Sequence, residues 1–147
     1  MAVVTIADRV VDAIIQHALE EAPLECCGLL LGRQGLLEEA VRCRNLAASP
    51  TRFLLAPEDL IAVVRRVRGT ATQVLGIYHS HPAGPEEPSE RDRQEFFYPA
   101  WSYWIVSLRR GRPVVRCFLW RDDQFVPQEF RCVSGAGQSA VSGDEVR

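Results

Sequence analysis

The chain of 147 residues contains no lysine, so all 17 of its basic residues are arginines. The absence of lysine removes every side-chain acceptor for an isopeptide bond. The arginines are nearly balanced by 19 acidic residues, and the formal net charge is -2. Nucleic-acid-binding domains normally concentrate basic residues on one surface, because phosphate contacts dominate their affinity. No basic stripe occurs in this sequence, and nucleic acid is therefore not an expected partner.

Long hydrophobic runs are also missing. The longest apolar stretches are short segments such as residues 26–31, and their length is far below the roughly 20 residues that span a bilayer. Asp8, Arg9 and Asp12 interrupt the apolar region that a signal peptide would need. The five cysteines are odd in number and form no C-x-x-C, which favours a reducing compartment over a disulfide framework. We therefore expect no membrane partner and a cytoplasmic location.

Hydrophobic periodicity and turn residues predict one layered domain. A chain of this length, with 47% hydrophobic residues, can bury a full core without metal or disulfide support. Thr5 and Asp8 have the spacing of a capping box before a first helix. Helices are expected over residues 6–21, 57–68 and 89–96, and strands over 26–31, 36–44, 74–81, 101–108, 113–120 and 124–130, with a short extended stretch near 53.

These elements indicate an α/β fold of the α+β type, in which helices flank a mixed, mostly antiparallel sheet. The domain is expected to cover residues 1–133. Residues 134–147 are rich in Gly, Ser and Ala and are predicted to form a disordered C-terminal tail. We expect no second domain.

The chemistry is concentrated in His79-Ser80-His81-Pro82 and in Ser89 and Asp92. Side chains alternate across a strand, so His79 and His81 point to the same side and can share one cation. Asp92 can return as a third ligand after the intervening Pro- and Gly-containing loop. Two histidines, one carboxylate and an open fourth position are typical of a catalytic zinc site.

Each half of this pattern also has a simpler interpretation. The sequence from Ser89 to Asp92 can be only a helix capping box, and the histidines can be only the polar end of a strand. Neither interpretation explains why both features occur together in register with the strand. We therefore favour the metal site, and expect each ligating histidine to donate its other N–H to an acceptor.

The pattern resembles the signature of the JAMM (MPN+) metalloproteases, of the compact prokaryotic type. That signature has an upstream Glu, then H-[ST]-H-P, a Ser after seven further positions, and an Asp three residues later. His79, His81, Ser89 and Asp92 match its spacing without a gap, and Glu25 opens the matching E-x-x-G segment. The resemblance implies a cytidine-deaminase-like MPN fold with a curved sheet.

The resemblance also assigns roles. It implies one Zn²⁺ per chain, held by His79, His81 and Asp92, which would lower the pKa of a water molecule. Glu25 would be the catalytic acid and base, and Ser89 would stabilise the oxyanion. Without the resemblance, Glu25 would be interpreted as a solvated residue at a helix-to-strand corner.

The activity implied is that of a zinc-dependent peptidase or isopeptidase. Its expected substrate and partner is a ubiquitin-like sulfur-carrier protein, or its adduct, hydrolysed at an amide bond of the Gly-Gly tail. A non-catalytic MPN-type interaction module stays open as an alternative, as does a relative from phage tail assembly or DNA repair.

Other titratable residues receive structural interpretations. His17 lies near the edge of the first helix's apolar stripe and is expected to be a boundary residue, not a ligand. Glu86 and Glu87 lie in the Pro-rich loop and are expected to be solvated. Tyr78 and Ser80 alternate with the histidines and should pack on the opposite side of the strand.

Overall fold

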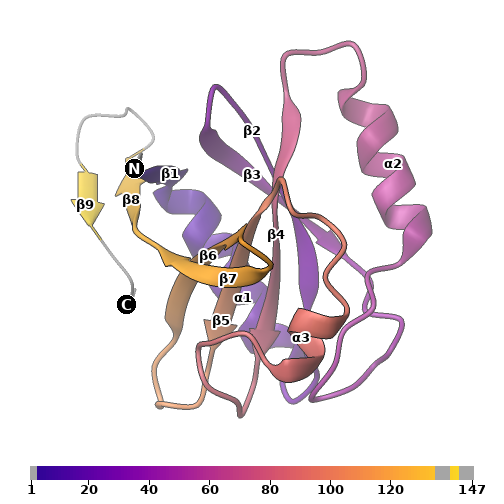
Figure 1. The fold of residues 1–147 in the computed structure, drawn as a ribbon, viewed down its shortest axis with the longest axis vertical. Coiled ribbons are helices and arrows are strands. Elements are labelled where there is room, and N and C mark those ends of the chain that lie inside the picture. Colours follow the sequence, from indigo (N-terminus) through magenta and orange to yellow (C-terminus); the bar gives the residue numbers. More distant parts are fainter. Residues whose placement is uncertain (1–2, 135–139, 143–147) are drawn as a thin grey trace.

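A computed structural model describes residues 3–134 and 140–142. In that part of the chain, Figure 1 shows a strongly curved sheet with helices on both faces. In chain order the elements are β1 (Val4–Ala7), α1 (Asp8–Glu21), β2 (Cys27–Arg33), β3 (Leu36–Cys43), α2 (Pro57–Val67), β4 (Gln73–His81), α3 (Glu90–Gln94), β5 (Ser102–Ser107), β6 (Val114–Arg121), β7 (Gln124–Gln128), β8 (Phe130–Val133) and β9 (Ala140–Ser142). The helices of these residues are all too short or too polar to cross a membrane.

The sheet has the strand order β7-β6-β5-β4-β2-β3-β1-β8-β9. Strand β1 is parallel to β3 and β8, and β4 is parallel to β5, whereas the other neighbours are antiparallel. The expected mixed, mostly antiparallel sheet is therefore confirmed. Strand β4, which carries the two histidines, lies in the interior of the sheet between β2 and β5.

Two apolar layers hold the helices against the sheet. On one face, Val10 and Ile14 of α1 pack in a cluster with Leu30, Tyr78 and Trp104. On the other face, α2 and the aromatic residues around α3 pack in a second cluster, whose members include Leu29, Leu31, Val63, Ile77, Phe96 and Tyr103. The alternation of Leu29, Leu30 and Leu31 between clusters follows from the period of two along a strand.

Strand β1 was not predicted, and the capping box expected from Thr5 and Asp8 is wrong. Residues 4–7 are extended, and α1 begins at Asp8 after Ala7, which provides no side-chain cap. The reason is tertiary: β1 pairs with both β3 and β8 and thereby joins two parts of the sheet. Local periodicity cannot register such a distant pairing.

The last predicted strand is two strands. Strand β7 pairs with β6, and β8 pairs with β1 at the other side of the sheet. The stretch near residue 53 forms no strand, although Leu55 makes an isolated bridge with Asn45. Most of the predicted tail lies outside the described residues, and within it β9 pairs antiparallel with β8. The domain boundary at 133 stays a prediction.

His17 is buried inside the α1 layer, where its Nδ1 lies 2.7 Å from the Tyr78 hydroxyl. Burial, together with the charge of Arg42, lowers the pKa of His17 from 6.5 to about 4. The unfolded chain therefore binds a proton at this position between about pH 6.5 and pH 4, and the folded chain does not. By linkage, stability falls as the pH decreases through that window.

We expect His17 to cost the metal-free protein about 2 kcal/mol of unfolding free energy at pH 5 relative to pH 7. Urea unfolding of the wild type and of His17→Gln at both pH values measures this contribution. The substituted amide cannot titrate but can still bond to Tyr78. An equal pH dependence in the two proteins would show that His17 is not responsible.

Candidate metal centre

The two histidines at the end of β4 point to the same face, as their spacing predicts. His79 and His81 are both buried, and their Nε2 atoms lie 3.0 Å apart. Tyr78 and Ser80, which alternate with the histidines along β4, are fully buried, and Tyr78 packs in the cluster beneath α1. One face of β4 therefore supplies polar ring nitrogens, while the other belongs to the core.

Asp92 reaches the histidines from α3. Its Oδ2 lies 3.3 Å from His79 Nε2 and 3.2 Å from His81 Nε2. The same Oδ2 accepts a hydrogen bond from the Ser89 N–H, and Ser89 Oγ accepts one from the Asp92 N–H. These residues therefore form the complete capping box and also bring the carboxylate to the histidines, so the two interpretations of the motif are compatible.

Glu25 lies between α1 and β2, with its carboxyl beside the histidines. One ligand atom from each of Glu25, His79 and His81 lies within 4.8 Å of the others. Glu25 is buried, and its Oε1 has no hydrogen-bond partner among the described residues. A solvated corner residue is thus the wrong interpretation of this position. Its catalytic role stays a prediction.

The pKa values of the two carboxyl groups are shifted in opposite directions. Burial raises the pKa of Glu25 to about 8, and the nearby charge of Asp92 acts in the same direction. Burial also opposes ionisation of Asp92, but the charge of His79 and the hydrogen bonds from His79, His81 and the Ser89 N–H outweigh it and lower the pKa. Such a separation is typical of sites that use one carboxyl as acid or base and keep the other ionised.

The geometry fits a metal ion. Ligand atoms around a tetrahedral ion with bonds of about 2.0 Å lie about 3.3 Å apart, and the three pairs formed by His79, His81 and Asp92 lie 3.0–3.3 Å apart. Burial lowers the pKa of His79 and so favours the neutral form of the ring, which is the form that binds a metal. The structure therefore supports a metal site at the end of β4.

The outer contacts of the histidines follow the expectation only in part. His81 Nδ1 lies 2.7 Å from the Pro85 carbonyl oxygen, so it donates there and leaves Nε2 for a metal. His79 Nδ1 has no partner among the described residues. Instead, the Phe53 ring stacks on His79 with a centroid distance of 4.4 Å. The orientation of His79 is thus fixed by packing.

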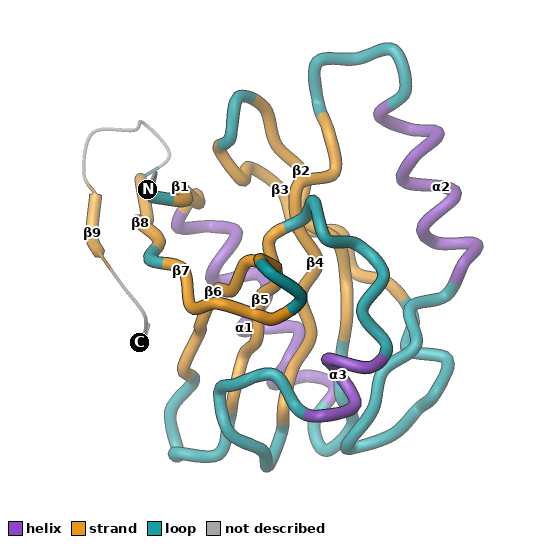
Figure 2. Tube along the Cα trace, viewed as in Figure 1, coloured by secondary structure: helices purple, strands orange, loops and turns teal. Residues whose placement is uncertain are grey.

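A cleft of about 340 Å³ opens beside these groups and is lined by Glu25, His81 and Ser89, by Pro50 and Thr51, and by the loop before Ser89. Figure 2 shows the loops after α1, β3 and β4 gathered at one end of the sheet. Ser89 Oγ accepts from Asp92 N–H, and the described residues offer its hydroxyl proton no acceptor. Because a hydroxyl donates once, that proton is available to a substrate oxygen.

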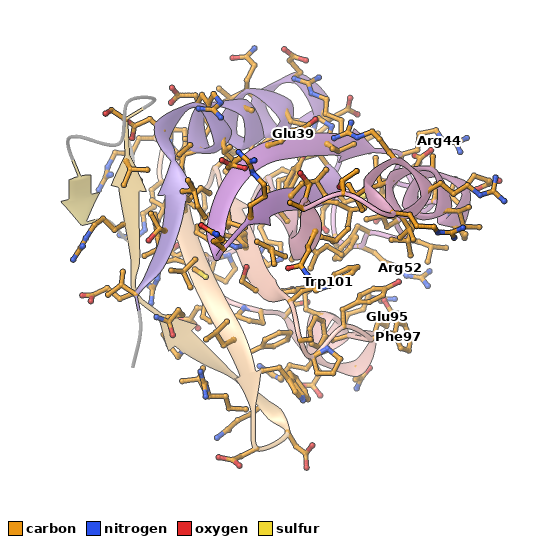
Figure 3. All side chains as sticks on the ribbon, turned by 90° about the horizontal axis from the view of Figure 1, so that it is seen from above. Glu39, Arg44, Arg52, Glu95, Phe97 and Trp101 are labelled. Atoms are coloured by element: carbon orange, nitrogen blue, oxygen red, sulfur yellow. The ribbon has the colours of Figure 1, made fainter. Side chains whose placement is uncertain are left out.

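A second, mainly apolar cleft of about 300 Å³ adjoins the other side of Asp92. Its walls include Phe53, Phe96 and Tyr103, and an ion pair of 3.3 Å joins Arg52 to Glu95 at its rim. In Figure 3 the labelled Arg52, Glu95 and Phe97 lie together on the side of the sheet opposite α1. The first cleft therefore reaches His81, and the second reaches Asp92.

Sequence reasoning missed several residues that build the site. Glu86 was expected to be solvated, but it is buried and forms an ion pair of 2.7 Å with Arg110. Ser107 Oγ donates to the Gly84 carbonyl in the same loop. No periodic pattern marks these contacts, since their partners come from a distant turn. His17 lies on the opposite face of the sheet, bonded to Tyr78, and is not a ligand.

Comparison with known proteins identifies the family of this chain. A family model described as prokaryotic homologs of the JAB domain matches residues 7–122. The chain belongs to this family. The resemblance to compact prokaryotic JAMM proteins is thereby confirmed, and with it the fold class. The glycine of the E-x-x-G segment also has a structural reason: a Cβ at Gly28 would collide with the Tyr78 ring and the Val41 carbonyl.

Relatives of this JAB-domain chain come from different contexts. Tail tip assembly protein K of Escherichia phage N15 is 39% identical over 104 residues, which cover 70% of this chain and 40% of that protein. The probable TtuB-protein conjugate cleaving protease of Thermus thermophilus is 40% identical over 111 residues, covering 75% of this chain and 71% of that protein. The chain thus spans less than half of the phage protein's length.

A solved structure has the same fold. The solution structure of a protein from Desulfitobacterium hafniense superimposes with a TM-score of 0.80 at 32% identity, and the match covers 88% of this chain and 92% of that chain. The match covers most of both chains, so the arrangement of the elements is common to the two proteins.

Proposed function

We propose that this protein is a zinc-dependent peptidase or isopeptidase with one zinc per chain. Its substrate is a ubiquitin-like sulfur-carrier protein joined through a C-terminal Gly-Gly tail to another molecule. The observation that carries the proposal is the convergence of His79, His81 and Asp92 beside a buried Glu25. The conjugate-cleaving relative from Thermus supports the substrate class.

In the proposed reaction His79, His81 and Asp92 hold the zinc. When bound, the ion supplies positive charge that lowers the pKa of a water molecule and polarises a carbonyl group. Glu25 removes a proton from the attacking water and delivers it to the departing amine, a role that suits a carboxyl whose pKa is raised by burial to about 8. Ser89 donates its free hydroxyl proton to the oxygen that becomes negative.

We expect the cleft beside Glu25, His81 and Ser89 to accept an extended tail without side chains. Pro50, Thr51 and the loop before Ser89 form its walls. A Gly-Gly tail meets little steric resistance in such a cleft, and its amide groups stay available for pairing with exposed backbone. Selectivity for glycine at the two positions before the scissile bond follows from this fit.

The test is hydrolysis of a carrier protein whose Gly-Gly tail is joined by an amide bond to a fluorescent amine. We expect turnover by the zinc-loaded chain, a loss of at least about 100-fold after chelation, and recovery with one equivalent of zinc. A carrier ending in Val-Val is the matched control and should be cleaved poorly. Hydrolysis that persists in full after metal removal would refute the proposal.

A second candidate is favoured by the similarity to the phage tail tip assembly protein. In that case the same site would act on, or assemble with, a phage tail protein. The carrier assay separates the two candidates, because a chain adapted to tail assembly should bind zinc but leave the carrier fusion intact. A non-catalytic interaction module would lack turnover on either class of substrate.

A further inference from the structure

The peptide segment that carries Glu25 belongs to no helix or strand. Helix α1 ends at Glu21, and β2 begins only at Cys27. A general base must lie within hydrogen-bond reach of the proton it takes, and a displacement of about 1 Å can cost roughly 100-fold in rate. Something outside the regular hydrogen-bond ladder must therefore position Glu25.

Three hydrogen bonds involve the Glu25 peptide group and the N–H that follows it. The Glu25 N–H donates to the Ser49 carbonyl at 2.9 Å, and the Glu25 carbonyl accepts from Asn45 Nδ2 at 3.0 Å. The next N–H, that of Cys26, donates to Ser80 Oγ at 2.8 Å. Ser80 lies between the two histidines, so this last bond ties the segment directly to β4.

Asn45 is the only side chain bonded to Glu25's own peptide group in the described part of the chain. Its Nδ2 also donates to the Arg52 carbonyl at 3.0 Å, while its Oδ1 accepts from the N–H groups of Ala47 and Leu54 at 3.0 and 2.9 Å. These four bonds use both donors and both acceptor positions of the amide. One partly buried side chain thus joins Glu25 to both ends of residues 45–55.

The segment 45–55 contacts the other components of the site. Phe53 stacks on His79, and Pro50 and Thr51 line the cleft together with Ser89. A shift of this segment would therefore move Glu25, the support of His79 and one wall of the cleft together. Asn45 is placed where it controls the separation between the base and the metal ligands.

We propose that Asn45 is a positioning residue that holds Glu25 in its catalytic position through the Glu25 carbonyl. The inference rests on the proposed function, and it assigns a role to a residue outside the JAMM signature. An aspartate at position 45 would keep the acceptors for Ala47 and Leu54 but would lose both donors. It would also present a carboxylate oxygen to two carbonyl groups, which repels the Glu25 segment.

Asn45→Asp, measured on the full zinc-loaded chain with the carrier fusion, should lower kcat about 100-fold. Zinc content should stay near wild type, since Asn45 contacts none of the ligands. KM should rise, because Pro50 and Thr51 of the cleft wall move with the segment. Thr70→Ala is the matched control: Thr70 Oγ1 bonds to backbone groups at Val67 and Thr72 in a different loop. It should retain wild-type kcat. Wild-type kcat in Asn45→Asp would overturn the proposal.

Amide hydrogen exchange tests the same inference without activity. In Asn45→Asp the Glu25 N–H should exchange at least about tenfold faster, because its partner Ser49 belongs to the released segment, while amides of α1 keep their protection. If Asn45→Asp does not fold, Asn45→Ser replaces it, because a hydroxyl can reach Ala47 but not the Glu25 carbonyl. Unchanged protection of the Glu25 N–H overturns the proposal. This exchange measurement needs no substrate, so it tests the role of Asn45 even if the carrier fusion is not cleaved.

Discussion

Glu25→Gln should lose about 10²- to 10⁴-fold in kcat, the range that positioned acid and base groups contribute, while keeping its metal. Glutamine has the same shape and can occupy the same buried position, but it cannot take a proton from water at neutral pH. His79, His81 and Asp92 are unaltered by the substitution, so the metal site stays intact. The measurement is steady-state hydrolysis of the carrier fusion beside metal analysis of the same sample.

Glu21→Gln is the matched control for this experiment. Glu21 is exposed at the end of α1, only four residues before Glu25. It should keep wild-type turnover, which excludes a general effect of removing negative charge from this region. If Glu25→Gln hydrolysed the carrier at the wild-type rate, Glu25 could not be the acid and base, and the proposed mechanism would be wrong.

The part of the site that the sequence predicts is the part that is local. His79 and His81 share a face because side chains on any strand repeat every two residues. The link from Ser89 to Asp92 is equally local, since a capping box spans one helical turn. The histidines and Asp92 are brought together by the short loop of residues 82–88. A short loop allows few other positions for α3 relative to β4.

The parts that the sequence did not predict depend on distant partners. Strand β1 has the apolar pattern of a helix start, but pairing with β3 and β8 decides its conformation. In the sequence Glu86 has the features of a solvated loop residue, yet the ion pair with Arg110 allows its side chain to be buried. Asn45 gives no signal in the sequence, because its four partners are backbone groups. The family resemblance supplied Glu25, which composition and periodicity alone would have left on the surface.

The groups of the proposed site are supported by different parts of the fold. Strand β4 lies in the interior of the sheet and presents His79 and His81 from a rigid support. The other two groups come from outside the sheet: Glu25 lies in the connection before β2, and Asp92 lies on the short helix α3. Hydrogen bonds such as that from the Cys26 N–H to Ser80 Oγ fasten the Glu25 connection to β4. In the proposed mechanism, a rigid support for the ligands and a separately fastened acid and base meet the demand for fixed geometry.

His81→Ala should remove the metal together with the activity. His81 Nε2 faces both His79 and Asp92, so its loss leaves two protein ligands where a catalytic zinc normally has three. We expect the purified wild type to bind about one zinc per chain, and the variant to retain almost none after dialysis. Asp92→Asn should also weaken metal binding, because it removes the negative charge while keeping a side chain that can cap α3.

The third histidine of the chain provides the control. His17→Gln removes an imidazole on the opposite face of the sheet, bonded to Tyr78, and should leave both zinc content and turnover near wild type. Metal analysis by mass spectrometry, with Co²⁺ absorption as a second readout of the ligand set, separates the variants. Full zinc binding in His81→Ala would place the metal elsewhere. Loss of zinc in His81→Ala alone would establish the end of β4 as the metal centre, independently of the substrate that this protein cleaves.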